Sequence, residues 1–358
     1  IMVKNESHLD ALTLEMLQNE TVSITLSIVY TVVALVSIPG NLFSLWVLCW
    51  HIKPKTPSVI FMINLSITDL MLASCLPFQI YYHHQSNHWT FDKTLCSLVT
   101  VMFYTNMYSS ILTMTLISVE RYVGVVHPLK LTKWRRKRYA LAACLVMWIF
   151  LLLAFYPLET ADLTYEVKEL DIITCFDVLK WDMLPTFAAW VAFLLTLFVV
   201  LFLIPFVVTV GCYIGIIRKL IQTSSQYGNR QKTRSIYLAT IVLLSFITCF
   251  APNNFILLAH MISRLFYSSS LYPAYKLTLC LSCFNNCIDP FIYYFASKEF
   301  YQKFMQLFRR NVLLSDSLEN RRESLFSGRT MSARSMSSGP MDGLEEVKVS
   351  LQRQESVF

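Results

Sequence analysis

The sequence predicts an all-α membrane protein: a bundle of seven transmembrane helices followed by one amphipathic helix at the membrane surface. Of its 358 residues, 55% are hydrophobic and only 15% are charged, whereas ordinary soluble domains carry about 25% charged residues. The apolar residues gather into runs of about 18 or more, a length that spans a bilayer as a helix. Basic residues follow every second run, as expected for cytoplasmic loops.

Seven apolar runs are long enough to cross a membrane. They cover Val22–Cys49, Ser58–Tyr81, Leu95–Val126, Tyr139–Pro157, Leu184–Ile217, Ile236–Ile262 and Leu271–Phe295. A large soluble helical protein would need polar faces on these helices, and they show almost none. The predicted organisation is an extracellular tail over residues 1–21, the bundle over 22–295, the surface helix over 296–310 and a disordered cytoplasmic tail over 311–358.

The distribution of lysine and arginine predicts the orientation. The odd-numbered runs are each followed by basic residues, which are densest at 130–138 and 218–234. Because short loops rich in lysine and arginine stay in the cytoplasm, the N-terminus is predicted to be extracellular. Residues 1–21 are polar and acidic, which argues against a cleavable signal peptide and leaves targeting to the first helix. We therefore expect a multi-pass plasma-membrane protein, whose net charge of +7 describes its cytoplasmic face and no nucleic-acid partner.

The ten cysteines divide by their depth in the predicted bundle. Eight fall inside spans, where cysteine is usually a small buried hydrophobe. Only Cys96 and Cys175 are expected on the oxidising side, so a disulfide between them is predicted. In the outer tail, Asn5 and Asn19 each begin an Asn-x-Ser/Thr tripeptide, and both are candidate glycosylation sites.

Polar side chains interrupt several spans and are predicted to converge. They are Asp69 in the second run, Asn106 and Ser110 in the third, and Asn285 and Asp289 in the seventh. Two facing carboxylates cannot both stay charged in lipid without a partner. One interpretation is an allosteric sodium ion held by these oxygens, with no other metal or cofactor expected. The alternative is a hydrogen-bonded network in which one carboxyl group is protonated.

An arginine stands at the inner end of the third run, within Glu120-Arg121-Tyr122. An ionisable residue at the end of a span is costly and is therefore a functional candidate. Five prolines that each lie inside an apolar run are Pro77, Pro157, Pro205, Pro252 and Pro290. Proline bends a helix because it removes an intrahelical hydrogen bond. Bent helices can act as levers, which a static scaffold does not need.

Several of these unusual residues, together with their neighbours, match in order the helix signatures of a known family. They are Gly40-Asn41, Asn64-x-x-x-x-Asp69, Glu120-Arg121-Tyr122, Trp148, Pro205 with Tyr213, Cys249-Phe250-Ala251-Pro252 and Asp289-Pro290-x-x-Tyr293. Over residues 22–308 the chain resembles the rhodopsin-like G-protein-coupled receptors. The resemblance implies a receptor and not an enzyme.

The resemblance also implies which residues couple the receptor to a heterotrimeric G-protein. They are Glu120, Arg121, Tyr122, Tyr213, Phe246, Phe250 and Tyr293. Glu120 would hold Arg121 at rest and then release it to meet the G-protein, while the tyrosines of the fifth and seventh helices swing inward to support it. The two phenylalanines of the sixth helix would couple ligand contact to outward motion of that helix. An agonist would act by binding the open state better.

Differences from other branches of the family narrow the choice of branch for this chain. Amine receptors carry an aspartate where this chain has Phe103, and light receptors carry a retinal lysine where it has Cys283. Phe250 in place of tryptophan and Asp289 in place of asparagine resemble the purinoceptor-type branch of nucleotide, lipid and peptidase-activated receptors. Three segments, 39–46, 249–254 and 353–358, resemble one member of that branch in particular.

The predicted ligand differs from that of the nucleotide-responding members. They carry His-x-x-Lys/Arg where this chain has Asn254 and Leu257, and residues 159–182 hold seven acidic residues against two lysines. That acidic loop repels a polyphosphate. We expect an aromatic slot with a modest positive rim, suited to a small extracellular amphiphilic anion or lipid conjugate. The alternative is a true purine nucleotide receptor. The candidate ligand-binding residues are Phe103, Tyr104, Tyr108, Asn254, Arg264 and Lys276.

The region beyond the bundle predicts cytoplasmic partners. Its first part is an amphipathic interfacial helix. Serine clusters in the tail are candidate sites for phosphorylation by receptor kinases, and arrestin is expected to bind the phosphorylated tail. Ser356, two residues before the apolar end Phe358, fits a PDZ ligand. The resemblance implies a G-protein of the Rho-activating twelve/thirteen class, a choice that the sequence itself does not make. A transporter or channel is a remote alternative, since no internal repeat is visible.

Overall fold

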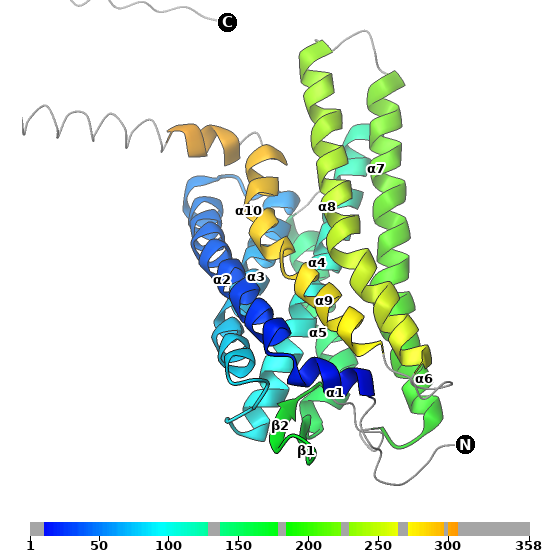
Figure 1. Cartoon of the computed structure of the whole chain (residues 1–358). Helices are drawn as coiled ribbons and strands as arrows, with labels where there is room; N and C mark the ends of the chain where they lie inside the picture. Colours follow the sequence, from blue (N-terminus) through cyan, green and yellow to red (C-terminus); the bar gives the residue numbers. More distant parts are fainter. Residues whose placement is uncertain are drawn as a thin grey trace, which may run out of the picture. The chain divides into compact units, whose positions relative to one another are not determined.

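The structure, a computed structural model, describes residues 11–127, 137–177, 184–222, 229–263, 271–296 and 300–306. Its long helices lie side by side as a bundle, with a short β-hairpin at one end (Figure 1). The elements are α1 (Ala11–Gln18), α2 (Glu20–Trp46), η1 (Val47–His51), α3 (Pro57–His84), α4 (Lys93–Val126), α5 (Lys137–Thr160), β1 (Thr164–Val167), β2 (Ile172–Cys175), α6 (Phe187–Leu195), η3 (Thr196–Leu203), α7 (Ile204–Gln222), α8 (Asn229–Ile262), α9 (Tyr272–Ser282) and α10 (Asn285–Ala296). Residues 300–306 are also helical.

Six helical stretches of the described residues are long and apolar enough to cross a membrane. They are Glu20–His51, Pro57–His84, Lys93–Val126, Lys137–Thr160, Phe187–Gln222 and Ser235–Ile262. Each coincides with one of the first six predicted spans to within a few residues at its ends. Two starts have a clear cause: the Thr56 hydroxyl accepts from the Val59 amide at 3.4 Å, and the Asp92 carboxylate accepts from the Leu95 amide at 3.2 Å. Such caps satisfy amide groups that a helix start leaves unpaired. The all-α membrane fold is confirmed.

The seventh predicted span, Leu271–Phe295, is helical but is not one continuous helix. It is divided into α9 and α10 at Cys283 and Phe284. There the Cys283 amide donates to the Cys280 carbonyl and the Phe284 amide to the Leu281 carbonyl, both at 3.2 Å. These three-residue steps are tighter than the four-residue steps of an α-helix. Hydropathy reports only the length of the apolar run and does not register such a break.

A close contact between α2 and α10 explains why glycine, asparagine and proline occur at three predicted positions. Pro290 has no amide hydrogen, so the carbonyl four residues earlier, on Asn286, loses its helical partner. The Asn41 side chain donates to that carbonyl at 3.0 Å. Beside it, a Cβ on Gly40 would stand 3.1 Å from Cγ of Pro290. Gly40 therefore permits the close approach, and Asn41 supplies the missing donor across it.

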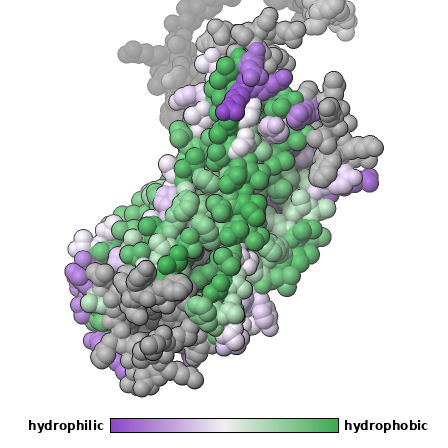
Figure 2. Space-filling model, turned by 90° about the vertical axis from the view of Figure 1, so that its right-hand side faces the viewer, coloured by the Kyte–Doolittle hydropathy of each residue, from purple (hydrophilic) through white to green (hydrophobic). Residues whose placement is uncertain are grey.

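The bundle exposes apolar side chains where a soluble protein would expose polar ones. Leu35, Val146 and Leu153 leave 70%, 65% and 69% of their surface exposed. Figure 2 shows such residues covering much of one face. An apolar area of this extent suits contact with lipid.

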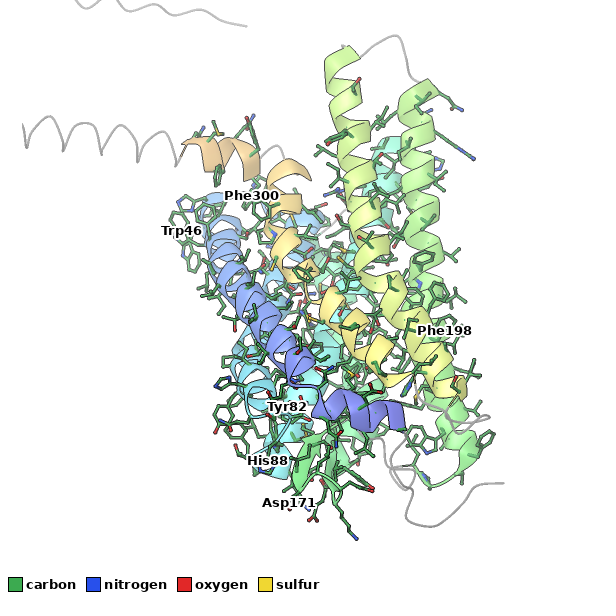
Figure 3. The ribbon with its side chains drawn as sticks, in the orientation of Figure 1. Trp46, Tyr82, His88, Asp171, Phe198 and Phe300 are labelled. Carbon is green, nitrogen blue, oxygen red and sulfur yellow. A yellow bond between two sulfur atoms is a disulfide. The ribbon has the colours of Figure 1, made fainter. Side chains whose placement is uncertain are left out.

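The two ends of the bundle carry different side chains. Figure 3 shows Tyr82, His88 and Asp171 near the hairpin of β1 and β2, and Trp46 and Phe300 at the opposite end. We call these the hairpin end and the far end. At the far end Phe300 is 2% exposed. It belongs to residues 300–306, which are the described part of the predicted surface helix.

The hairpin is tied to the bundle by the predicted disulfide, which is confirmed. β1 and β2 pair antiparallel, with Thr164 opposite Cys175. Cys175 is bonded to Cys96 at the start of α4, and their Cα atoms are 5.8 Å apart. A second tie runs from the Trp89 amide to the Ile173 carbonyl at 2.7 Å. The chain that follows Cys175 is thereby led to the mouth of the bundle.

Replacing either cysteine should have the same effect as replacing both. Cys96→Ser and Cys175→Ser remove the same bridge. In small disulfide-bonded domains the loss of one bridge lowers the free energy of unfolding by about 2–5 kcal/mol. Each single variant should therefore lower the amount of receptor at the cell surface equally, and the double variant should be no worse. Surface labelling measures this. Additive losses in the double variant, or a free thiol found at either position by mass spectrometry, would contradict the pairing.

Candidate ligand pocket and coupling site

A small cavity opens at the hairpin end between α2, α3, α4, α9 and the segment after β2. Its lining is largely aromatic and consists of Tyr30, Gln79, Thr100, Phe103, Tyr104, Cys175, Phe176, Asp177, Tyr272, Tyr275, Lys276 and Leu279. Three of the six predicted ligand-binding residues, Phe103, Tyr104 and Lys276, belong to it. Arg264 lies outside the described residues. The structure thus brings half of the predicted set together around one cavity.

The other two predicted ligand residues bind each other. Tyr108 is completely buried and Asn254 is 1% exposed. The Tyr108 hydroxyl donates to the Asn254 side-chain oxygen at 3.1 Å. This bond joins α4 to α8 directly. Tyr104 makes a comparable link to α9, because its hydroxyl is hydrogen-bonded to the hydroxyl of Tyr275.

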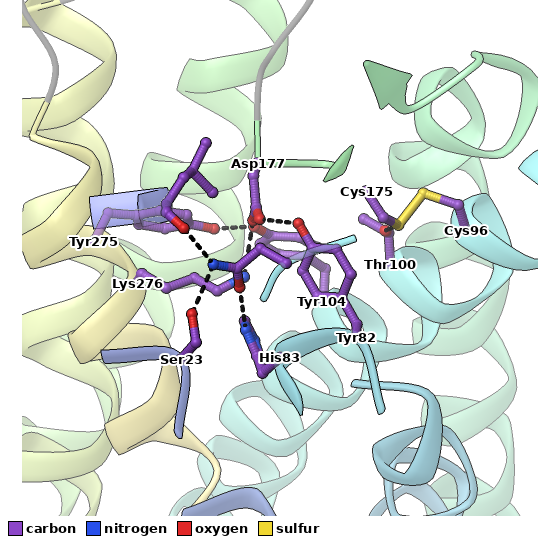
Figure 4. Close-up of polar contacts among 12 residues, drawn as sticks. Ser23, Tyr82, His83, Cys96, Thr100, Tyr104, Cys175, Asp177, Tyr275 and Lys276 are labelled. Atoms are coloured by element: carbon purple, nitrogen blue, oxygen red, sulfur yellow. Dashed lines mark hydrogen bonds and ion pairs between the residues drawn. A yellow bond between two sulfur atoms is a disulfide. The ribbon is translucent and has the colours of Figure 1, made fainter. Parts of the chain in front are cut away.

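A buried ion pair occupies the cavity wall. Lys276 and Asp177 are 7% and 8% exposed, and Nζ of Lys276 donates to Oδ1 of Asp177 at 2.9 Å. The Tyr82 hydroxyl donates to the other carboxylate oxygen at 2.5 Å, and Tyr272 provides a further hydrogen bond. Figure 4 shows Tyr82 and Lys276 meeting at Asp177. The predicted cation is therefore already paired within the chain.

The ion pair controls the protonation of Asp177. Burial alone would raise the pKa of its carboxyl group, but the charge of Lys276 and hydrogen bonds from Lys276, Tyr272 and Tyr82 outweigh burial and hold the pKa below its ordinary value. Asp177 thus stays ionised at neutral pH. Sequence reasoning counted it only as one of seven repelling acids. Its position two residues after Cys175 could have indicated its place, because the disulfide carries this segment to the mouth of the bundle.

A polar cluster lies deeper, and it contains most of the residues predicted to converge. The Asn106 amide donates to Asp69 at 3.2 Å, and the Asn285 amide donates to Asp289 at 2.8 Å. The two carboxyl groups are close enough to interact, and Oδ2 of Asp69 and Oδ1 of Asp289 have no hydrogen-bond partner among the described residues. Ser110 is 1% exposed, and its hydroxyl has no hydrogen-bond partner in the part of the chain that the structure describes. Two buried carboxyl groups this near each other require a proton or a cation between them, so both interpretations of the sequence stay open.

The predicted coupling residues gather toward the far end. The Ser58 hydroxyl donates to the Glu120 carboxylate at 2.5 Å, and Arg121 lies close enough to Tyr213 of α7 to interact with its hydroxyl electrostatically. Tyr122 packs against Gly215, where an added Cβ would stand only 2.5 Å from Cε2 of the ring. Contacts of this kind join α3, α4 and α7 around the arginine.

Aromatic rings of the sixth span connect the coupling residues with the middle of the bundle. Phe246 and Phe250 are at most 1% exposed. Their ring centres are 5.5 Å apart in an edge-to-face arrangement, and Phe246 stacks on Phe206 of α7 at 6.1 Å. Offset and edge-to-face ring pairs are favourable arrangements. The side chain of Tyr293, also predicted to take part, is outside the described ones.

One further tie completes the pattern of a signalling bundle. The Trp148 indole donates to Asn64 at 2.9 Å, and the Asn64 amide donates to the Thr113 hydroxyl at 3.0 Å.

A broken seventh span, a disulfide-tethered loop over a pocket and an arginine at the far end are features of one receptor class. Residues 40–293 match the family model of the 7 transmembrane receptor (rhodopsin family), and the chain belongs to that family.

Named relatives refine this assignment. The chain is 85% identical over 357 residues to purinoceptor 8 of Gallus gallus, with the full length of both covered. It is 59% identical over 359 residues to the Homo sapiens protein named S-geranylgeranyl-glutathione receptor, again over both full lengths. Human proteinase-activated receptor 1 is 39% identical over 274 residues, which is 76% of this chain and 64% of that relative. The predicted resemblance to purinoceptor 8 is thereby confirmed over the whole chain.

Family membership establishes the broad function. The protein is a receptor of the purinoceptor-type branch, not an enzyme. It is a multi-pass protein of the plasma membrane that couples an extracellular ligand to a G-protein.

The contact between Gly215 and Tyr122 gives a matched test of the coupling residues. Gly215→Ala should displace the Tyr122 ring and reduce G-protein activation by the overexpressed receptor several-fold, because the added carbon overlaps the ring. Gly211→Ala is the control, since a Cβ there meets nothing within 4 Å. Nucleotide exchange on the G-protein, normalised to surface expression, is the measurement. Equal signalling by both variants would show that the ring position does not matter.

The stability of the receptor should depend on pH through Asp177. Because its pKa is lower in the folded protein, its contribution is fully present above the ordinary aspartate pKa of about 4 and is lost as pH falls through the folded value. Asp177→Asn should lower the melting temperature at pH 7, where removing one partner of a buried ion pair costs about 3–5 kcal/mol. The difference from the unmodified receptor should shrink as the pH approaches 3.

Thermal melting of purified receptor in detergent measures both effects. Asp171→Asn serves as the control, because Asp171 is exposed and its carboxylate should contribute little. A difference between Asp177→Asn and the unmodified receptor that stays constant from pH 7 to pH 3 would contradict an ionised Asp177.

Proposed function

We propose that this receptor responds to an extracellular amphiphilic anion, a lipid conjugate with a small polar head. The observation that carries the proposal is the buried pair of Asp177 and Lys276. Lys276 is the single lysine or arginine among the described residues that line the pocket, and Asp177 already neutralises it. A polyphosphate would therefore meet no net positive charge there. A head group with one or two negative charges can bind by sharing the Lys276 ammonium with Asp177, or by taking the place of Asp177 as its partner.

The rest of the lining supports an apolar partner. Tyr30, Phe103, Tyr104, Phe176 and Tyr275 supply aromatic surface around the ion pair. Ligand pockets with mainly apolar walls and a few placed polar groups bind molecules that are themselves mostly apolar. The name of the human relative, S-geranylgeranyl-glutathione receptor, describes such a molecule. A polyprenyl chain attached to a short peptide fits the same division between apolar and polar parts.

We further propose that the hairpin end faces the outside of the cell. Disulfides persist on the oxidising side of a membrane, and the one here lies at the hairpin end. The basic segments 130–138 and 218–234 would then be cytoplasmic. With this orientation Asn5 and Asn19 are candidate glycosylation sites. Asn5 is outside the described residues, and the Asn19 side chain caps α2 through its oxygen, which leaves the opposite atom, its nitrogen, for a glycan.

The cytoplasmic side supplies the signalling half of the proposal. Arg121, which lies close to Tyr213, is proposed to meet a G-protein of the Rho-activating twelve/thirteen class. The cluster around Asp69 and Asp289 is proposed to bind sodium, which would relieve the repulsion between the two carboxyl groups. Serines of the tail are proposed as sites for receptor kinases and arrestin, and they lie outside the described residues.

A ligand and reporter panel tests the function. Cells that express the receptor should activate a twelve/thirteen reporter with S-geranylgeranyl-glutathione, and ADP and UDP should be inactive. Lys276→Met should raise the half-maximal concentration of the conjugate about tenfold or more, since one charge-assisted hydrogen bond to a buried group is worth about 1.5–3 kcal/mol. Activation by ADP or UDP alone would favour the second candidate, a nucleotide receptor, which the purinoceptor name of the chicken relative supports.

The end of the chain is proposed to bind a PDZ domain, although residues 355–358 lie outside the described ones. A hydroxyl at Ser356 and an apolar Phe358 suit strand addition, in which backbone amides hold the free carboxylate. A peptide of the last ten residues should bind. Versions that lack Phe358, carry a C-terminal amide or carry phosphate on Ser356 should bind at least about tenfold more weakly, as phosphate adds up to two negative charges. Equal binding by the amidated peptide in fluorescence polarisation would refute carboxylate capture.

A further inference from the structure

A second, smaller cavity shares Tyr272 and Lys276 with the ligand pocket. It has a volume of about 10 Å³, enough for one water molecule, and it is lined by Met16 and Leu17 of α1 and by His83 and Asn87 at the end of α3. Thus α1, which lies in the predicted N-terminal tail, is part of this site. The two cavities are neighbours because they have Lys276 in common, so a ligand in one is close to the other.

The orientation of the Asn87 side chain fixes the hydrogen on His83. The Asn87 amide nitrogen donates to the Leu17 carbonyl at 3.2 Å and to the Ser23 hydroxyl at 2.7 Å. Its oxygen therefore faces Nδ1 of His83, at 2.7 Å. An amide oxygen only accepts, so Nδ1 must carry the hydrogen and donate it. Figure 4 shows His83 and Ser23 close to Lys276.

With its hydrogen on Nδ1, neutral His83 presents a bare lone pair at Nε2. His83 is 1% exposed, and Nε2 has no partner among the described residues. A buried acceptor without a donor carries a penalty of about 1–3 kcal/mol. This atom is therefore prepared to receive a donor that the chain itself does not provide.

Lys276 supplies the opposite chemistry in the same cavity. An ammonium group has three hydrogens, and the hydrogen bond to Asp177 uses one of them. Lys276 is near enough to act electrostatically on the His83 ring. The cavity thus offers an acceptor on α3 and spare donors on α9.

We infer that this cavity widens, with displacement of α1, to bind a peptide amide of the ligand head. The amide N–H donates to Nε2 of His83, and the amide carbonyl accepts from Nζ of Lys276. A fully ionised phosphate or carboxylate offers only acceptors and leaves His83 unsatisfied, while an ammonium group offers only donors and gives Nζ of Lys276 nothing to donate to. A hydroxyl offers both functions on one atom, whereas the N–H and C=O of a planar trans amide point in opposite directions and can reach two walls. This inference rests on the proposed function and specifies the head group.

The first arm of the test measures binding without signalling. Purified full-length receptor is melted with S-methylglutathione, which has two peptide bonds, or with S-methylcysteine, which has none. S-methylglutathione should raise the melting temperature in a concentration-dependent way, and S-methylcysteine should not. No shift with S-methylglutathione at millimolar concentration overturns the inference. The result is independent of whether S-geranylgeranyl-glutathione activates a reporter, so the two proposals can fail separately.

Two substitutions distinguish a ligand contact from a structural role. His83→Asn keeps a nitrogen near the position of Nδ1 that can donate to Asn87, but it removes the acceptor at Nε2. His83→Gln places an oxygen near Nε2 and gives up the bond to Asn87. We expect His83→Asn to weaken the binding of S-methylglutathione at least about tenfold, the effect of losing one hydrogen bond to a buried group. His83→Gln should stay within about threefold of the unmodified receptor.

The opposite order, with His83→Gln impaired and His83→Asn unaffected, would mean that His83 only supports Asn87 and α1. Unchanged binding in both variants would mean that the cavity holds water rather than the ligand. Either result overturns the inference. Expression and melting temperature without probe are recorded for each variant, so that a loss of fold is not taken for a loss of binding.

Discussion

The ion pair between Asp177 and Lys276 is the interaction on which the hairpin end of this receptor depends. A carboxylate placed alone among transmembrane helices would be penalised by several kcal/mol. Here the Lys276 ammonium and two tyrosine hydroxyls surround it. Phe176 and Asp177, which follow β2, can therefore form part of the pocket wall. The neutralisation of Lys276 in the pocket by Asp177 follows from that position.

The same requirement applies at the middle of the bundle, where polar groups must find partners in other helices because lipid offers none. The Asn41 amide compensates for the hydrogen bond that Pro290 removes from α10. The carboxyl groups of Asp69 and Asp289 find donors in neighbouring asparagines and still face each other. In these two places, a helix that lacks a backbone hydrogen bond and a pair of buried carboxyl groups each have a specific polar side chain as partner. The residues involved, Asn41, Asp69, Asp289 and Pro290, belong to the family signatures.

The sequence predicted the features that depend on composition along the chain. Spans follow from hydropathy, and the pairing of Cys96 with Cys175 follows from the depth of the other eight cysteines. It did not predict features that depend on contacts between distant segments. The break at Cys283, the helix α1 in the tail and the pairing of Asp177 with Lys276 all belong to this second group.

The candidate site shows the same division. Tyr104 and Lys276 were expected at the pocket because family positions indicate them, and both line it. Tyr108 and Asn254 were expected to face the ligand, but their mutual hydrogen bond joins α4 to α8. His83 was not singled out as a binding residue. Its significance arises from the amide orientation of Asn87, which a sequence does not record.

The place of Cys175 in the lining of the pocket imposes a chemical condition on what binds there. A thiolate attacks a disulfide sulfur, forms a mixed disulfide and releases the other cysteine as a thiolate. A small molecule with a free thiol that enters this cavity meets such a disulfide, the one that holds the loop over the bundle. A thioether has no thiolate to offer and leaves the bridge intact. A ligand whose sulfur is already alkylated can therefore bind beside the bridge without dismantling the wall of its own site.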